Sequence, residues 1–180
     1  MKFNPRGMKT AIYGIQGSGK THFLKKGMLQ AFKRPLIFKV TRDFDGLVNR
    51  KDIYLYSPQN QIKEFPQFCK IAKEMAEQGL IDAIIIDEAD RFLYNNHVVH
   101  NNPEFHRLVD EHRHFNKLQP EGVALVFMTR RPQEVATTIT ETSLYTIIFA
   151  SAGQNNIKRL SNIHKDIYDM LGHLTKDNHR

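Results

Sequence analysis

The chain has 180 residues, 41% of them hydrophobic, and this length suits one domain with a single core rather than two well-packed domains. We therefore expect a single domain over residues 1–180, and its one cysteine, Cys69, excludes an internal disulfide. The net charge of +7 favours polyanions as partners over acidic proteins. No apolar run approaches the roughly 20 residues that span a bilayer, and the N-terminus lacks the apolar segment of a signal peptide. A soluble, cytoplasmic protein without a transmembrane segment is expected.

Short apolar runs alternate with longer amphipathic stretches along the chain. The runs are rich in β-branched and aromatic residues and nearly continuous, as in strands buried on both faces of a parallel sheet. In chain order we expect a strand at 10–13, a helix at 20–32, strands at 36–40 and 53–56, a helix at 62–78, a strand at 83–86, a surface loop at 91–103, a helix at 104–117, a strand at 124–128, a helix at 132–138, a strand at 144–149 and a helix at 161–171. The fold class is α/β, a doubly wound, mostly parallel sheet flanked by helices, with ligands at the carboxyl ends of the strands.

The first expected strand runs into the segment GIQGSGKT at residues 14–21. This segment matches G-x-x-x-x-G-K-[ST] between an apolar strand and a helix-forming stretch, which is the context that the P-loop motif requires. Glycines let successive N–H groups point at phosphate oxygens. We expect Lys20 to reach the β- and γ-phosphates of ATP, and the Thr21 hydroxyl to bind Mg²⁺. The expected nucleotide-binding residues are Gly14, Gln16, Gly17, Ser18, Gly19, Lys20, Thr21 and His22.

A second motif is IDAIIIDEAD, in which four apolar residues lead to Asp87 and Glu88 at the end of a buried strand. Two adjacent carboxylates repel each other there unless a cation lies nearby. We expect Asp87 to hold Mg²⁺ through its water shell and Glu88 to act as general base for the attacking water. The alternative is that the two acids merely begin a loop. Residues 87–90 also spell a helicase motif, but we interpret Ala89 and Asp90 as coincidental because nothing else resembles a helicase core.

A third motif is ALVFMTRRP, where an apolar strand ends in Thr129, Arg130 and Arg131. A polar residue at this strand end can sense the γ-phosphate if the strand lies between the P-loop strand and the strand before Asp87. Thr129 is the sensor candidate, and a plain strand-end hydroxyl is the alternative. One of the two arginines is a candidate to reach phosphate or a neighbouring subunit, and the other is a candidate to contact DNA. The alternative is that either arginine is a solvated charge on a loop.

The segments GIQGSGKT, IIIDEADRF, EHRHFN and LVFMTRRPQEV resemble, in this order and spacing, the HerA/FtsK-like P-loop ATPases. Within that group the chain is similar to the small genome-packaging ATPases of viruses with an internal membrane, over most of its length from Lys9 to about Phe149. The resemblance implies a P-loop NTPase with an additional catalytic glutamate, assembled as a homo-oligomeric ring around double-stranded DNA. It makes Arg113 an arginine-finger candidate and Thr129 the sensor. Where the group usually has glutamine, this chain has Arg130.

The leading hypothesis is therefore a Mg²⁺- and ATP-dependent translocase that packages viral DNA. It would act in the host cytoplasm or at the virion vertex, where a capsid or membrane vertex protein is a further partner. A nucleotide-dependent switch or a phage assembly ATPase of the zonula-occludens-toxin type is an alternative, although the latter usually carries a membrane segment. A nucleotide kinase is another, but the adjacent carboxylates fit water activation better. Arg113 also has a simpler interpretation, a surface ion pair with Asp110 or Glu111.

Overall fold

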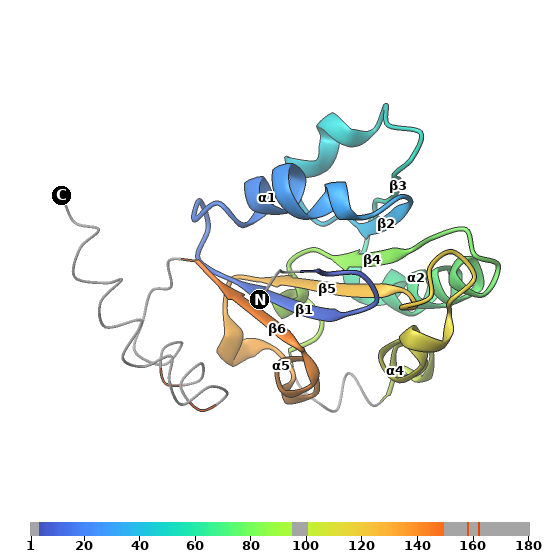
Figure 1. Ribbon diagram of the computed structural model, residues 1–180. Helices are drawn as coiled ribbons and strands as arrows, with labels where there is room; N and C mark the ends of the chain where they lie inside the picture. The colour runs from blue at the N-terminus through green and yellow to red at the C-terminus, as the bar shows by residue number, and fades with distance from the viewer. Residues whose placement is uncertain (1–3, 95–100, 150–157, 159–161, 163–180) are drawn as a thin grey trace.

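Six parallel strands form the central sheet of the computed structural model, which describes residues 4–94, 101–149, 158 and 162 (Figure 1). Neighbouring strands pair in parallel in the order β3-β2-β4-β5-β1-β6. The expected strands are confirmed, and so is the position of β5 between β1 and β4. Their bounds are β1 (Lys9–Tyr13), β2 (Pro35–Phe38), β3 (Tyr54–Tyr56), β4 (Ala83–Ile86), β5 (Ala124–Thr129) and β6 (Tyr145–Ile148).

Helical segments cover both faces of this sheet, so the doubly wound architecture is confirmed. On β4, Ile84 and Ile86 join one core cluster and Ile85 joins the other. The first cluster lies against α2 (Gln61–Glu77), α4 (Pro103–Glu111) and α5 (Thr137–Thr142), and the second lies against α1 (Lys20–Phe23) and the segment after it (Figure 1). Because both faces of the strands are buried, the strands appear in the sequence as continuous apolar runs.

The helices expected at 20–32, 62–78 and 104–117 are present, but two of them change geometry along their length. After α1 the chain continues as a π turn, η1 (Leu24–Met28), and a 3₁₀ turn, η2 (Leu29–Ala31). Helix α2 is regular, and its N-cap Asn60 accepts a hydrogen bond from the backbone N–H of Lys63 at 3.0 Å. Helix α4 ends at Glu111 and continues as the 3₁₀ turn η5 (His112–His114).

The single helix expected at 132–138 is wrong. The structure has a 3₁₀ turn, η6 (Pro132–Glu134), then Val135 with extended backbone, and α5 begins at Thr137. Val135 and Ala136 are buried, and the Ala136 N–H donates to the Leu93 carbonyl at 2.9 Å, so this tertiary hydrogen bond replaces a helical one. Residues 95–100 of the expected loop, and all but one residue of the helix expected at 161–171, lie outside the described residues.

Two further 3₁₀ turns follow strands where no element was expected. The turn η3 (Arg42–Leu47) follows β2, and η4 (Ala89–Arg91) follows β4. Both lie at the carboxyl edge of the sheet, where η3 brings the Oδ2 of Asp43 within 3.4 Å of the Thr21 hydroxyl. In the part of the chain that the structure describes, no helix has the length and apolar character needed to cross a membrane.

Candidate nucleotide-binding site

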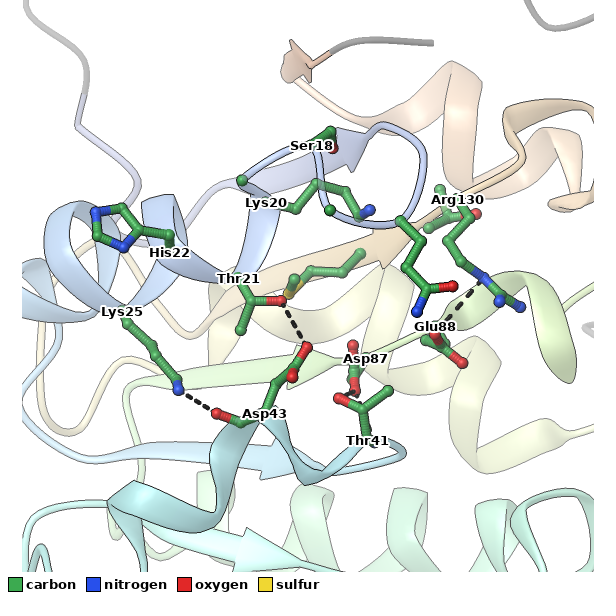
Figure 2. Close-up of a pocket in the computed structure, with 15 residues that line it drawn as sticks. Ser18, Lys20, Thr21, His22, Lys25, Thr41, Asp43, Asp87, Glu88 and Arg130 are labelled. Atoms are coloured by element: carbon green, nitrogen blue, oxygen red, sulfur yellow. Dashed lines mark hydrogen bonds and ion pairs between the residues drawn. The ribbon is translucent and has the colours of Figure 1, made fainter. Parts of the chain in front are cut away.

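The carboxyl ends of β1, β2, β4 and β5 border a cavity of about 340 Å³ (Figure 2). This is the edge where open α/β sheets bind ligands. Its lining includes each residue expected to bind nucleotide or metal except Gly14, together with the catalytic candidates Glu88 and Thr129, but not Arg113. The lining residues are Gln16, Gly17, Ser18, Gly19, Lys20, Thr21, His22, Lys25, Thr41, Asp43, Asp87, Glu88, Met128, Thr129 and Arg130.

The loop between β1 and α1 is held in shape by its own backbone and by Lys20. Gly19, the residue before α1, has a φ of 97°, a left-handed conformation that costs a residue with a Cβ about 1–2 kcal/mol. The Lys20 ammonium donates to the carbonyl oxygens of Gly14, at 2.5 Å, and Ile15, at 2.9 Å. Gly14 thus contributes through its carbonyl rather than by lining the cavity. Burial lowers the pKa of Lys20, whereas the negative charges of nearby carboxylates raise it.

Two features of this loop fit a phosphate group. The ammonium of Lys20 is bonded to neutral carbonyls, and a phosphate oxygen is a stronger acceptor for it because both partners are charged. The Ser18 side-chain oxygen is buried and has no hydrogen-bond partner among the described residues. Buried polar atoms normally have partners, so an anion in the loop would satisfy a donor that the protein leaves open.

Asp87 is held rigidly by the segment after β2. Its Oδ2 accepts hydrogen bonds from the Thr41 hydroxyl at 2.9 Å, the Thr41 N–H at 3.1 Å and the Val40 N–H at 3.3 Å. Asp87 is 3% exposed, and burial raises the pKa of its carboxyl group while these hydrogen bonds lower it. One carboxylate oxygen is therefore fixed by the protein, which orients the side chain toward the cavity (Figure 2).

The residues around Asp87 fit a magnesium ion that arrives with a nucleotide. The Thr21 hydroxyl lies across the cavity and donates to Asp43 Oδ2 at 3.4 Å (Figure 2). Within the described ranges there is no cluster of three or more His, Cys, Asp or Glu residues that would hold a metal alone. Mg²⁺ typically takes one or two carboxylates and completes its shell with phosphate oxygens and waters. Thr21, Asp43 and Asp87 supply that kind of partial ligand set.

Glu88 adopts a strained backbone conformation and faces two arginines. Its φ of 47° and ψ of 49° are left-handed, which is uncommon for residues other than glycine and recurs at functional sites. The Arg91 Nε contacts Glu88 Oε2, and the Arg130 Nε lies 3.5 Å from Oε1. Burial raises the pKa of Glu88, while the positive charges of Arg130 and Arg91 lower it. A carboxylate whose pKa is moved toward neutrality is suited to general base catalysis.

The hydroxyl of Thr129 is bonded on both sides. It donates to Asp90 Oδ1 at 3.0 Å and accepts from the Arg131 N–H at 3.2 Å. Asp90 is 5% exposed and also accepts from the Arg130 N–H at 3.3 Å. Asp90 therefore joins the ends of β4 and β5, a structural role that its place in the helicase-like motif did not predict. The sensor role of Thr129 stays a prediction.

Thr41, Asp43 and Asp90 are site residues that the sequence motifs did not indicate. Thr41 stands just after the expected strand at 36–40, and Asp90 follows the acidic pair, so their positions after strands were the available signal. Their partners lie 46 and 39 residues away in the sequence, and only the sheet order brings them together.

Arg113 lies at the opposite edge of the sheet. The turn η5 packs beside the start of β5, where the Val123 N–H donates to the His112 carbonyl at 2.8 Å. Arg113 is exposed, and in the described part of the chain it forms no ion pair with Asp110, whose carboxylate instead pairs with His106 at 3.3 Å. An arginine at this edge reaches a nucleotide site only if the site belongs to another subunit.

The sheet order, the loop before α1 and the acidic pair after β4 define a P-loop NTPase fold. A similar structure is the genome packaging NTPase B204 of Sulfolobus turreted icosahedral virus 2 in complex with ATP-gammaS, with a TM-score of 0.73, 18% identity, 97% of this chain covered and 88% of that chain. B204, the DNA-packaging ATPase of Sulfolobus turreted icosahedral virus, is similar with a TM-score of 0.71 and 20% identity, and the match covers 97% of this chain and 88% of that chain.

The cytoplasmic domain of EssC is also similar, with a TM-score of 0.52 and 18% identity over 86% of this chain and 35% of that chain. No protein-family model matches the chain, and a sequence comparison with curated proteins gives no match. At these identities the structural likeness establishes the shared fold alone.

Proposed function

We propose that this chain hydrolyses Mg-ATP and couples hydrolysis to the movement of double-stranded DNA into a viral capsid. The observation that carries the ATPase half is the convergence of Lys20, Thr21, Asp87 and Glu88 on one cavity, although they come from two separate segments. The packaging half is supported by the similarity to genome-packaging NTPases over nearly the full length of both chains.

Each residue has a role that follows from its contacts. Lys20 exchanges the carbonyls of Gly14 and Ile15 for β- and γ-phosphate oxygens. Thr21 and Asp87 would hold Mg²⁺, which supplies charge neutralisation on the phosphates. Glu88 accepts a proton from the attacking water, and its raised pKa strengthens it as a base.

Movement along DNA requires several copies of the chain. One domain of 180 residues has too little surface to enclose a duplex, so we propose a homo-oligomeric ring whose net positive charge faces the phosphate backbone. In such a ring Arg113 belongs to the neighbour's site as an arginine finger. A capsid or membrane vertex protein is a further partner, and the host cytoplasm is the proposed location.

The decisive experiment measures ATP turnover with and without double-stranded DNA while recording particle mass. We expect turnover to rise with DNA in an oligomer, and Lys20→Ala to lose nucleotide binding and turnover while staying folded. DNA affinity should fall steeply between about 50 and 200 mM salt and depend weakly on sequence. Slow, unstimulated turnover by a monomer would replace the motor by a nucleotide switch, and phosphate transfer to a nucleoside monophosphate would replace it by a kinase.

A further inference from the structure

Arg130 follows β5 directly and extends its guanidinium into the nucleotide cavity (Figure 2). No other arginine lines that cavity within the described residues, since Arg131 is exposed and pairs with Glu134 at 2.7 Å. The Arg130 Nε lies 3.5 Å from Glu88 Oε1, and its Nη2 lies 3.6 Å from Asp90 Oδ2. The guanidinium thus stands between two carboxylates, one of which is the proposed base.

Neither carboxylate uses the hydrogen-bonding capacity of this guanidinium. Both contacts exceed the 2.7–2.9 Å of a strong charge-assisted hydrogen bond, and the Nε of Arg130 is buried without a hydrogen-bond partner in the described part of the chain. Asp90 already accepts from the Thr129 hydroxyl and the Arg130 N–H, and Glu88 also contacts Arg91. The Arg130 headgroup therefore holds Glu88 by charge and keeps donors available for a better acceptor.

A terminal phosphate is such an acceptor. It carries more negative charge than a carboxylate, and its oxygens match the planar fork of a guanidinium. Lys20 and Arg130 line the same cavity. When Lys20 binds the phosphates of a nucleotide, the terminal phosphate therefore lies in the cavity that Arg130 also lines. A nucleoside triphosphate has that phosphate and a diphosphate does not.

We propose that Arg130 is a positioning residue within its own subunit, which restrains Glu88 until the terminal phosphate of a bound nucleoside triphosphate takes over its guanidinium. The Oε1 of Glu88 is then free to face the attacking water, while Oε2 keeps its contact with Arg91. The inference rests on the proposed ATPase function. It also makes Arg130 the residue that distinguishes a triphosphate from a diphosphate, so the base is released only in the complex that has a bond to hydrolyse.

The first test is binding, which does not depend on turnover. Affinities for β,γ-methylene-ATP and for ADP, each with Mg²⁺, are measured for wild type, Arg130→Gln, Arg130→Lys and the matched control Arg131→Gln. Loss of a charged hydrogen bond of about 1.5–3 kcal/mol predicts a roughly tenfold or greater loss of triphosphate affinity in Arg130→Gln. ADP affinity should change little, Arg130→Lys should retain part of the discrimination, and Arg131→Gln should match wild type. An equal loss for both nucleotides, or no loss, overturns the proposal.

The second test is the split between kcat and KM for ATP. Because Glu88 no longer has to be released in Arg130→Gln, we expect KM to rise roughly tenfold or more and kcat to fall by less than that, with both constants as in wild type for Arg131→Gln. A large loss of kcat at unchanged KM contradicts the restraint on Glu88. A purely structural arginine would lower the melting temperature and the affinities for both nucleotides together.

Failure of the inference is distinguishable from failure of the proposed function. A wild type that binds neither nucleotide overturns both. A wild type that binds and hydrolyses ATP without responding to DNA loses the packaging role but leaves the Arg130 tests intact. If Lys20→Ala loses both nucleotides while Arg130→Gln loses neither, the ATPase stands and the role of Arg130 falls.

Discussion

At the scale of single residues, Asp87 and Glu88 are adjacent in the chain but have different environments. Asp87 accepts three hydrogen bonds from Val40 and Thr41, which fix one of its oxygens. Glu88 has a left-handed backbone, and in the described structure its carboxylate faces the positive charges of Arg91 and Arg130. Environment sets the role of a carboxylate, and we propose that it makes Asp87 a fixed ligand and Glu88 a movable base.

Glu88→Gln tests this division of roles. The amide cannot accept the proton of the attacking water, so turnover should fall by about a hundredfold or more. Mg-ATP should stay bound, because Lys20, Thr21 and Asp87 are unchanged. Phosphate release and nucleotide affinity measured on the same preparation check both statements. If Asp87→Asn and Glu88→Gln each leave turnover intact, the acidic pair is not the catalytic centre.

His112 provides a prediction about stability rather than activity. His112 is 2% exposed, and burial lowers the pKa of its ring from 6.5 to about 4, while Lys9, Arg113 and His114 add positive charge around it. Between these two values the unfolded chain binds a proton that the folded chain does not, so the unfolding free energy rises with pH. As pH falls through this window, His112 should lower the unfolding free energy by about 3 kcal/mol.

Urea unfolding at several pH values between 7 and 4.5 measures that slope. The Nδ1 of His112 lies 2.9 Å from the Val123 carbonyl, and an asparagine amide can donate to the same oxygen. His112→Asn should therefore flatten the pH dependence of the unfolding free energy. Equal slopes in wild type and His112→Asn would mean that other groups dominate acid unfolding.

At the scale of elements, the strands were predictable because burial on both faces makes them continuous apolar runs. The P-loop and the residues after β4 were predictable because their motifs are local. The break at Val135 was not, since it depends on a hydrogen bond from Ala136 to Leu93 and on burial in the core. Partners such as Thr41 for Asp87 were hidden for the same reason, because they depend on which strands become neighbours.

Gly122 gives a prediction for the junction of η5 and β5. Its φ is +88°, and a Cβ there would lie 2.5 Å from the Arg113 Cα. Left-handed strain and overpacking together predict that Gly122→Ala lowers the unfolding free energy by about 3 kcal/mol. Gly46→Ala is the matched control, because nothing lies within 4 Å of its Cβ position. The urea midpoints of the two variants are compared, and equal midpoints would show that the backbone at this junction shifts to accommodate the Cβ without a loss of stability.

At the scale of the whole molecule, the proposed site is divided between the two edges of the sheet. Lys20, Asp87, Glu88 and Arg130 lie at the carboxyl edge, and Arg113 lies beside the amino end of β5. A head-to-tail contact between copies brings one edge against the other, and such heterologous contacts generate rings when the rotation closes. The geometry of a single chain thus allows Arg113 a catalytic role only across a subunit boundary.

Mixing two inactive variants tests that boundary. Arg113→Ala subunits keep Glu88, and Glu88→Gln subunits keep Arg113, so some interfaces in a mixed ring combine an intact base with an intact neighbouring arginine. Each variant alone should be nearly inactive, and the mixture should recover part of the wild-type ATPase rate. Mass measurement verifies that mixed rings form, and Arg131→Ala alone, which leaves Arg113 and Glu88 intact, should keep most of the wild-type ATPase rate. Mixed rings that stay inactive would transfer the trans-acting role from Arg113 to Arg131, because Arg130 already borders the cavity of its own subunit.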